Sequence, residues 1–446
     1  MKQYDLTQGV IWRQIIRFSL PLLASSFVQL LYNTVDLLFA GALGKEASAA
    51  VGASSLVITC IVGFFTGISV GNGVVVSQAV GEKNAAKIGK SVQTGVKASL
   101  IGGVVLTLVG IIASRQILIW MKTPADILPA ATDYARYYLL CMTPLVLYNM
   151  NTGIICATGD SKTPMLAQLV GGIMNVILDA LAIFVFQLGL VGIALASTVS
   201  QGIAALITLR CLLRVDGPAH LHFTGMKIDY GILKEILRIG APAGLQSLVI
   251  TLSNVFVQSK INGFGVDEIA AFASYFKVEL LIYLPIVAIG QAAMTFTGQN
   301  VGANQMDRVK KGVRICIAIG IVYTVCAAGL LLLFGKQAFW LFNRDAGVIS
   351  CGLRIIRVTF PFYWLYVVLE VLADAIRGSG RSISPMILIL LNICVLRTVF
   401  LFLFTSYSMS LEAVAATYPT AWFTAAVSLV LYWHSGKVLS SLKRGV

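Results

Sequence analysis

The length of its uncharged segments is what most constrains how this chain can fold. No charged residue lies between Glu46 and Glu82 or between Asp179 and Arg210. Each run exceeds the roughly 20 apolar residues with which a helix crosses about 30 Å of hydrocarbon. Only 12% of the residues are charged, against about 25% in a typical soluble protein. Because the runs are continuous and do not alternate as in a β-barrel, we predict an all-α polytopic membrane protein with twelve transmembrane helices.

The distribution of basic residues bears on partners and orientation. The formal net charge is +14, a value that would by itself be compatible with nucleic-acid binding. Lys and Arg are concentrated, however, in alternate short segments between the apolar runs. That pattern is typical of the positive-inside rule, by which basic loops remain in the cytoplasm. We therefore expect no nucleic-acid partner, a multi-pass location in the cell membrane and both termini in the cytoplasm.

The chain contains an internal repeat. A shift of 221 residues aligns it with itself without a gap, so that Pro21 meets Pro242 and Gly81 meets Gly302. Six spans in each half is an even number, so both halves insert the same way up and are related by a pseudo-two-fold axis along the membrane normal. We predict an N-terminal six-helix lobe (1–213), a cytoplasmic linker (214–234) and a C-terminal six-helix lobe (235–446).

Several repeated motifs carry a family resemblance. They are "NTVDLLFAGALG" (33–44), "SQAVGEKN" (77–84) with its echo "TGQNVGANQ" (297–305), and "ATGDSKTP" (157–164) with "RGSGRSISP" (377–385). In this order and duplication, within a twelve-span frame, they resemble the MATE family, the multidrug and toxic compound extrusion transporters. The resemblance implies a monomeric antiporter that exports small organic, often cationic compounds, driven by inward flow of Na⁺ or H⁺, with no other cofactor.

The resemblance also implies a cation-coupling site in the first lobe. Its members would be Asp36, Asn175, Asp179 and Thr198, and the same set would hold the metal ion if the coupling cation is Na⁺; Ser197 is adjacent to Thr198. Asn175 and Asp179 are four residues apart and share one helix face.

The physical chemistry of these residues supports that assignment independently. An ionised Asp at a helix centre costs about 2.5–3.5 kcal/mol on insertion scales, and no basic residue lies nearby in these spans. Either a bound Na⁺ or a proton held by one carboxyl would relieve the two acids. The alternative is that the polar groups only hold helices together.

Other polar residues within the spans are weaker candidates. Asn33, Tyr148, Asn149 and Asn151 would line the first-lobe cavity or make ordinary interhelical hydrogen bonds. In the second lobe, Val257 and Phe400 occupy the positions equivalent to Asp36 and Asp179. A second-lobe polar network would contain Lys277, Glu279, Glu370 and Arg397, either as interior ion pairs or as groups that handle substrate or protons.

The sequence favours a cation-coupled multidrug efflux antiporter that works by alternating access. The nearest alternative keeps the architecture and carries lipid or oligosaccharide-lipid as a flippase. A membrane-embedded enzyme is a third alternative, but the spans contain no HExxH motif and no histidine apart from His434 at the end of the last span, so a nucleophile–base pair or metal site within them is not expected. We therefore expect no enzymatic activity.

Overall fold

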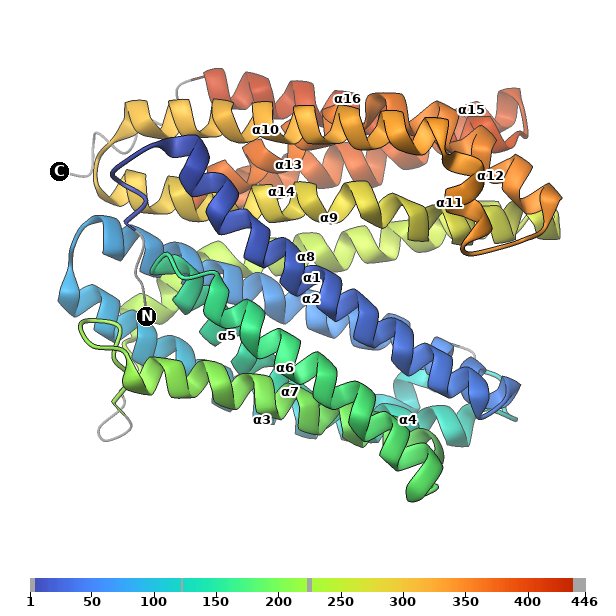
Figure 1. Ribbon diagram of the computed structural model, residues 1–446, viewed down its shortest axis with the longest axis horizontal. Helices are drawn as coiled ribbons and strands as arrows, with labels where there is room; N and C mark the ends of the chain where they lie inside the picture. The colour runs from blue at the N-terminus through green and yellow to red at the C-terminus, as the bar shows by residue number, and fades with distance from the viewer. Residues whose placement is uncertain (1–4, 122, 223–226, 436–446) are drawn as a thin grey trace. The chain divides into compact units, whose positions relative to one another are not determined.

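The computed structural model describes residues 5–121, 123–222 and 227–435. Residues 223–226 of the predicted linker, and the ends of both predicted lobes at 1–4 and 436–446, lie outside that part. Within the described residues the chain is helical and contains no strand (Figure 1), as the hydropathy pattern predicts.

The first half of the chain forms seven α-helices and one π-helical segment. Their bounds are α1 Ile11–Ala42, α2 Lys45–Gly81, α3 Ala85–Trp120, α4 Leu128–Leu139, α5 Met142–Ala157, α6 Lys162–Ala180, η1 Leu181–Val185 and α7 Gly189–Arg214.

The second half repeats this order with more breaks. Its elements are α8 Tyr230–Ile261, α9 Val266–Gly302, α10 Met306–Leu333, α11 Gly335–Trp340, α12 Ala346–Thr359, η2 Phe360–Phe362, α13 Tyr363–Gly378, α14 Ile383–Ile389, η3 Leu390–Leu396, α15 Arg397–Tyr407 and α16 Leu411–His434.

The expected number of spans is reached when one broken helix is counted as a span. Among the described residues, eleven helical stretches are long and apolar enough to cross a membrane, and the bent pair α4 and α5 makes a twelfth. The two helices meet at 42°. Pro144 lies in the first turn of α5 and has no N–H to donate to the carbonyl of Leu140, which is where the helix breaks.

The helices form two compact units. One contains Asp5 and residues 20–244, and the other contains residues 6–19 and the chain from 245 onwards. α1 therefore begins in the second unit and continues in the first, and α8 does the reverse. The lobe boundaries at 213 and 235 stay a prediction.

The backbone conformation shows the same 221-residue repeat as the sequence. Lys83 has a φ of 53° and Asn304, 221 positions later, has a φ of 57°. Gly159 and Gly380, also 221 apart, have φ values of 93° and 88°. These left-handed conformations follow the C-terminal ends of equivalent helices and favour residues such as glycine or asparagine. The two halves therefore share local turns as well as helix order.

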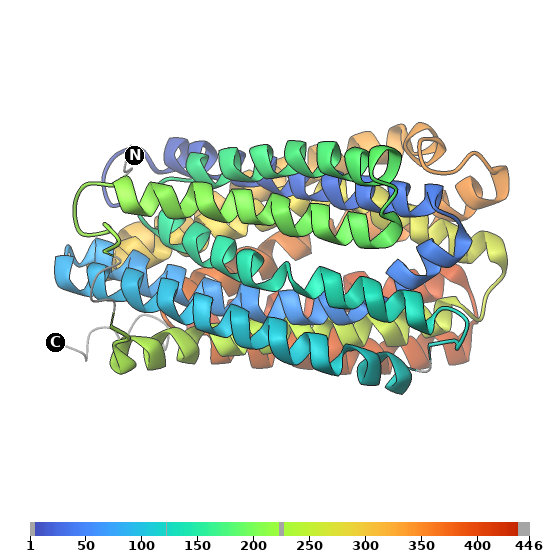
Figure 2. The same ribbon diagram turned by 90° about the horizontal axis from the view of Figure 1, so that it is seen from below.

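In the first unit, α3, α5 and α7 surround a core of aliphatic side chains that includes Val92, Val96, Ile154 and Ile155. α6 and α7 run side by side (Figure 2). In the second unit, α9 packs against α13, and the largest fully buried side chains include Phe272, Tyr275, Phe360 and Tyr363. The first core is thus mainly aliphatic, whereas the second contains several large aromatic side chains, among them two tyrosines.

Candidate functional site

Three helices bring polar side chains together inside the first unit. α1 supplies Asp36, α6 supplies Asn175 and Asp179, and α7 supplies Ser197. A Cβ on Gly172 of α6 would collide with the side chain of Val28 on α1, so the glycine lets these two helices approach closely.

Hydrogen bonds join three of the four side chains in this cluster, and Asp179 lies beside them. The Ser197 hydroxyl donates to Asp36 Oδ2 at 3.0 Å, and Asn175 Nδ2 donates to Ser197 Oγ at 3.5 Å. Asp179 lies near enough to Asp36 for the two carboxyl groups to interact electrostatically. The exposed fractions are 8% for Asp36, 1% for Asn175 and 0% for Asp179. Two neighbouring acids are therefore buried away from water.

The cluster has more acceptors than donors. Asp36 Oδ1, both carboxyl oxygens of Asp179 and Asn175 Oδ1 are buried and lack a hydrogen-bond partner. None of the ion pairs in the described part of the chain involves either acid. Carboxylate and amide oxygens are ligands of hard cations, and a pair of carboxyl groups can also share a proton. The residues present therefore fit a bound Na⁺ or a bound proton.

The hydroxyl group at this cluster belongs to Ser197 and not to the predicted Thr198. Thr198 Oγ1 donates to the carbonyl of Ala194 in its own helix at 2.9 Å. Adjacent residues on a helix point about 100° apart, so only one of the two can face α1. The structure brings together three of the four predicted residues, and their role in cation coupling stays a prediction.

Two residues next to the acids, Tyr32 and Gln201, were not predicted from the sequence. Tyr32, 6% exposed, lies beside Asp36, and its hydroxyl accepts a hydrogen bond from Gln201 Nε2 at 3.1 Å. Gln201 lies four residues after Ser197, on the same face of α7. That spacing is the sequence signal that could have identified it.

The other first-lobe candidates lie apart from this cluster. Asn33 is exposed and Asn149 is half-buried. The Tyr148 hydroxyl donates to the carbonyl of Pro164 at 3.2 Å, and Asn151 Nδ2 donates to Thr208 Oγ1 at 3.2 Å. For Tyr148 and Asn151, the observed contacts are interhelical hydrogen bonds.

The predicted ion pairs in the second lobe are not formed. None of the ion pairs within the described ranges joins two of the four residues Lys277, Glu279, Glu370 and Arg397. Lys277 is exposed, and its ammonium lies 5.8 Å from the ring centre of Phe342. The pairs that this unit does form are Arg354–Glu412 and Arg377–Asp374.

Tyrosine hydroxyls take the place of the expected cations. Glu279 accepts hydrogen bonds from Tyr275, at 3.1 Å, and from Tyr363. Glu370 lies beside Tyr366 and Asp374. Neutral donors can satisfy a buried carboxyl without a basic partner, which explains why the pairing prediction fails.

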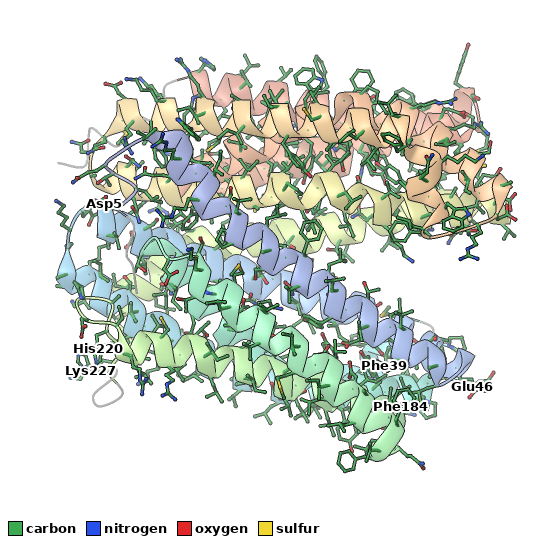
Figure 3. All side chains as sticks on the ribbon, viewed as in Figure 1. Asp5, Phe39, Glu46, Phe184, His220 and Lys227 are labelled. Atoms are coloured by element: carbon green, nitrogen blue, oxygen red, sulfur yellow. The ribbon has the colours of Figure 1, made fainter. Side chains whose placement is uncertain are left out.

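The cluster lies toward one end of the first unit. Phe39, three residues after Asp36, contacts Phe184 of η1 with ring centres 6.0 Å apart. Both lie at the end that carries Glu46, whereas Asp5, His220 and Lys227 lie at the opposite end of that unit (Figure 3).

These features define an α-helical membrane protein made of two homologous halves, with two acids buried in one of them. A MatE family model matches the chain twice, over residues 21–181 and 242–403. The two matches begin 221 residues apart, like the internal repeat. The chain therefore belongs to the MATE family, the multidrug and toxic compound extrusion transporters, and is a transporter rather than an enzyme.

Individual relatives cover nearly the whole chain. The probable multidrug resistance protein YoeA of Bacillus subtilis (strain 168) is 28% identical, over 95% of this chain and 93% of the relative. Multidrug export protein MepA of Staphylococcus aureus (strain NCTC 8325 / PS 47) is 24% identical, over 87% of this chain and 86% of the relative. A solved outward-facing structure of a multidrug resistance MATE family transporter is 26% identical, with a TM-score of 0.92 and coverage of 100% and 99%.

Proposed function

We propose that this chain is a cation-coupled antiporter that exports small organic, mainly cationic compounds across the cell membrane by alternating access. The observation that carries the proposal is the burial of Asp36 near Asp179, because three of their four carboxyl oxygens are buried without a hydrogen-bond partner. The names of the relatives support the class of substrate, because they are described as multidrug resistance or multidrug export proteins.

The coupling mechanism follows from where the two acids are attached. Asp36 lies on α1, and Asp179 lies on α6. When both are ionised they repel each other, which favours separation of α1 from α6 and α7. A proton or Na⁺ at the cluster removes that repulsion and favours close packing. The cation thus prefers one arrangement of these helices, and antiport requires the exported compound to prefer the other.

The free energy released when one cation crosses the membrane is large enough to drive export of a solute against a concentration gradient. One elementary charge that moves down 100 mV releases about 2.3 kcal/mol. At 25 °C this sustains roughly a fifty-fold concentration ratio of an uncharged solute. We further propose that both termini are cytoplasmic, in line with the bias of basic residues. The acids then lie nearer the external end of the first unit, which is the side from which the coupling cation enters.

The test uses the purified protein in proteoliposomes with an imposed Na⁺ or pH gradient. Efflux of a fluorescent organic cation is measured for the wild type, Asp36→Asn and Asp179→Asn, with the exposed Glu46→Gln as a matched control. We expect gradient-driven efflux in the wild type and the control, and its loss in both buried variants. Undiminished efflux in both Asp variants would refute the coupling site. Movement of labelled lipid-linked sugar without dye efflux would favour a flippase.

A further inference from the structure

Arg397 is a buried cation that has no anionic partner. It begins α15, directly after the π-helical segment η3, and is 4% exposed. It takes part in none of the ion pairs formed by the described residues. A charged Arg near the centre of a transmembrane helix costs about 2.5–3.5 kcal/mol on insertion scales. Such a residue is rarely left without a counter-charge.

The groups that do contact Arg397 are all neutral. Its Nη2 donates to Ser253 Oγ at 3.0 Å and to Asn254 Oδ1 at 2.8 Å, both on α8. The guanidinium carbon lies 5.4 Å from the ring centre of Tyr418 on α16. Its Nε is buried and has no hydrogen-bond partner.

Glu279, an acid close enough to this region to be considered as a partner, already accepts hydrogen bonds from other residues. Glu279 and Arg397 both act on Tyr418, but Glu279 accepts its hydrogen bonds from Tyr275 and Tyr363. The guanidinium therefore has no acidic partner among the described residues, and its Nε–H is unused.

We propose that Arg397, with Ser253 and Asn254, binds an oxyanion, namely the carboxylate of a small organic substrate. Nη2 is held by Ser253 and Asn254, and the unpaired Nε–H is a charged donor of the kind that binds a carboxylate oxygen strongly. Asn254 is exposed, so a ligand can reach the site from that side of α8. The buried ring of Tyr418 lies beside the guanidinium and helps to fix its position.

The inference deepens the proposed export function, on which it rests for the claim that the ligand is transported. It extends the substrates from organic cations to zwitterions and organic anions. Binding is measured without any gradient, so loss of carboxylate preference and loss of ion coupling are observed separately.

The experiment compares two probes that differ only in one carboxylate, tetramethylrhodamine free acid and its methyl ester. Their affinities for the purified full chain are measured by fluorescence polarisation. Charge-assisted hydrogen bonds contribute about 1.5–3 kcal/mol, so we expect the wild type to prefer the free acid by about tenfold or more. Arg397→Gln should abolish that preference and keep the affinity for the ester within about twofold. Arg397→Lys, which keeps the charge and loses the planar fork, should retain part of it.

Retained ester binding shows that Arg397→Gln is folded, and the exposed Arg344→Gln controls for loss of a positive charge elsewhere. Equal affinities of the wild type for the two probes, absence of binding by both, or an unchanged preference in Arg397→Gln would each overturn the proposal. So would native mass spectrometry that shows phosphatidylglycerol bound to the wild type and not to Arg397→Gln, without a probe preference. In that case the oxyanion is a lipid phosphate.

Discussion

The two halves of this transporter place opposite charges within the same three-helix arrangement. In the first half, α1 carries Asp36, whereas the equivalent residue of α8 is Val257. In the second half, the segment equivalent to α6 carries Arg397, whereas the equivalent residue of α6 is Val176. Each charged residue therefore has an apolar residue as its repeat equivalent in the other half.

The partners of the charges are also repeat equivalents. Ser197, which donates to Asp36, corresponds to Tyr418, whose ring lies beside Arg397. Asn254, which accepts from Arg397, corresponds to the exposed Asn33. Duplication has thus preserved the place where helices one, five and six of each half meet, while the polar groups diverged. The same frame suits a cation in the first half and, by our inference, an oxyanion in the second.

The comparison is tested most strongly by the effect of cations on stability. Na⁺ at one hundred times its Kd should stabilise the wild type by about 2.7 kcal/mol, because it binds the folded site and not the unfolded chain. Protons should act in the same direction by a smaller amount, because the unfolded acids also bind them. Asp179→Asn should lose this increment, since it removes one of the two repelling acids. The measurement is Tm in detergent across a Na⁺ titration at fixed pH and a pH titration at fixed Na⁺.

The matched control for this prediction lies in the other half. Arg397→Gln should keep the cation-dependent rise in Tm, because its site takes the opposite charge. If Asp179→Asn and Arg397→Gln both lose the rise, the two sites are not independent and the division of roles between the halves is wrong.

A second difference between the halves lies in how closely α8 approaches α2 within the first unit. A Cβ on Gly71 would collide with backbone atoms of Ile236 and Gly240. The repeat equivalents of Gly71 and Gly240 are Ala292 and Ser19, both in the second unit, and these residues already carry a Cβ. Gly71→Ala should therefore lower stability by about 1–3 kcal/mol, the usual range for overpacking.

Thermal unfolding in detergent measures this effect. Gly202→Ala on α7 is the matched control, because nothing lies within 4 Å of the added Cβ, and it should leave Tm unchanged or slightly raised. Equal Tm values for Gly71→Ala and the wild type would show that the close contact is not required.

Much of the helical architecture could be predicted from the sequence. The hydropathy pattern predicts the membrane-spanning helices, and the internal repeat predicts which helices of the two halves correspond. The resemblance to the family grouped Asp36 with Asn175 and Asp179, and the four-residue spacing placed the latter two on one helix face. Ser197 could not be separated from Thr198, because the rotation of α7 about its axis depends on tertiary packing.

The second-half contacts were harder to predict for a different reason. Opposite charges in neighbouring spans suggested ion pairs, but the donor to Glu279 from its own helix is Tyr275, four residues earlier. Opposite charge therefore predicts the wrong partner for a buried carboxyl where tyrosine hydroxyls are available as donors. The four-residue helix spacing correctly predicts one of the donors to Glu279, which is Tyr275.

A smaller prediction tests the neutral surroundings of Arg397 directly. Asn254→Asp would place a carboxylate at the oxygen that now lies 2.8 Å from Arg397 Nη2. We expect stabilisation of about 1 kcal/mol, below the value for a fully buried charge-assisted bond because Asn254 is exposed. The new carboxylate should also compete with the free-acid probe and reduce its preference over the ester. Both Tm and probe affinity are measured.

Asn33→Asp, at the equivalent position of the first half, serves as the control. It adds the same charge at an exposed residue, and should change neither Tm nor probe preference. A similar response in both variants would mean that added charge, and not pairing with Arg397, explains the result.

The smallest expected effect concerns Asp229, which precedes α8 and has Gln8 as its repeat equivalent. Its carboxylate accepts from the backbone N–H groups of Ile232 and Gly231, and Lys90 Nζ lies 3.2 Å away. The Ile232 N–H first, and then Lys90, hold the pKa of this carboxyl below its usual value. Because the folded pKa is lowered, the stabilisation is present above the ordinary pKa of about 3.9 and is lost as pH falls through the folded value.

Asp229→Asn keeps the helix cap, since asparagine caps about as well as aspartate, and removes only the charge. Its Tm should lie slightly below that of the wild type at neutral pH, and the two should converge in acid. Added salt should shrink the difference at neutral pH, because the pair with Lys90 is exposed and screened. A difference that persists below the folded pKa would show that the contribution of Asp229 is not electrostatic, and that this end of α8 is held by its cap alone.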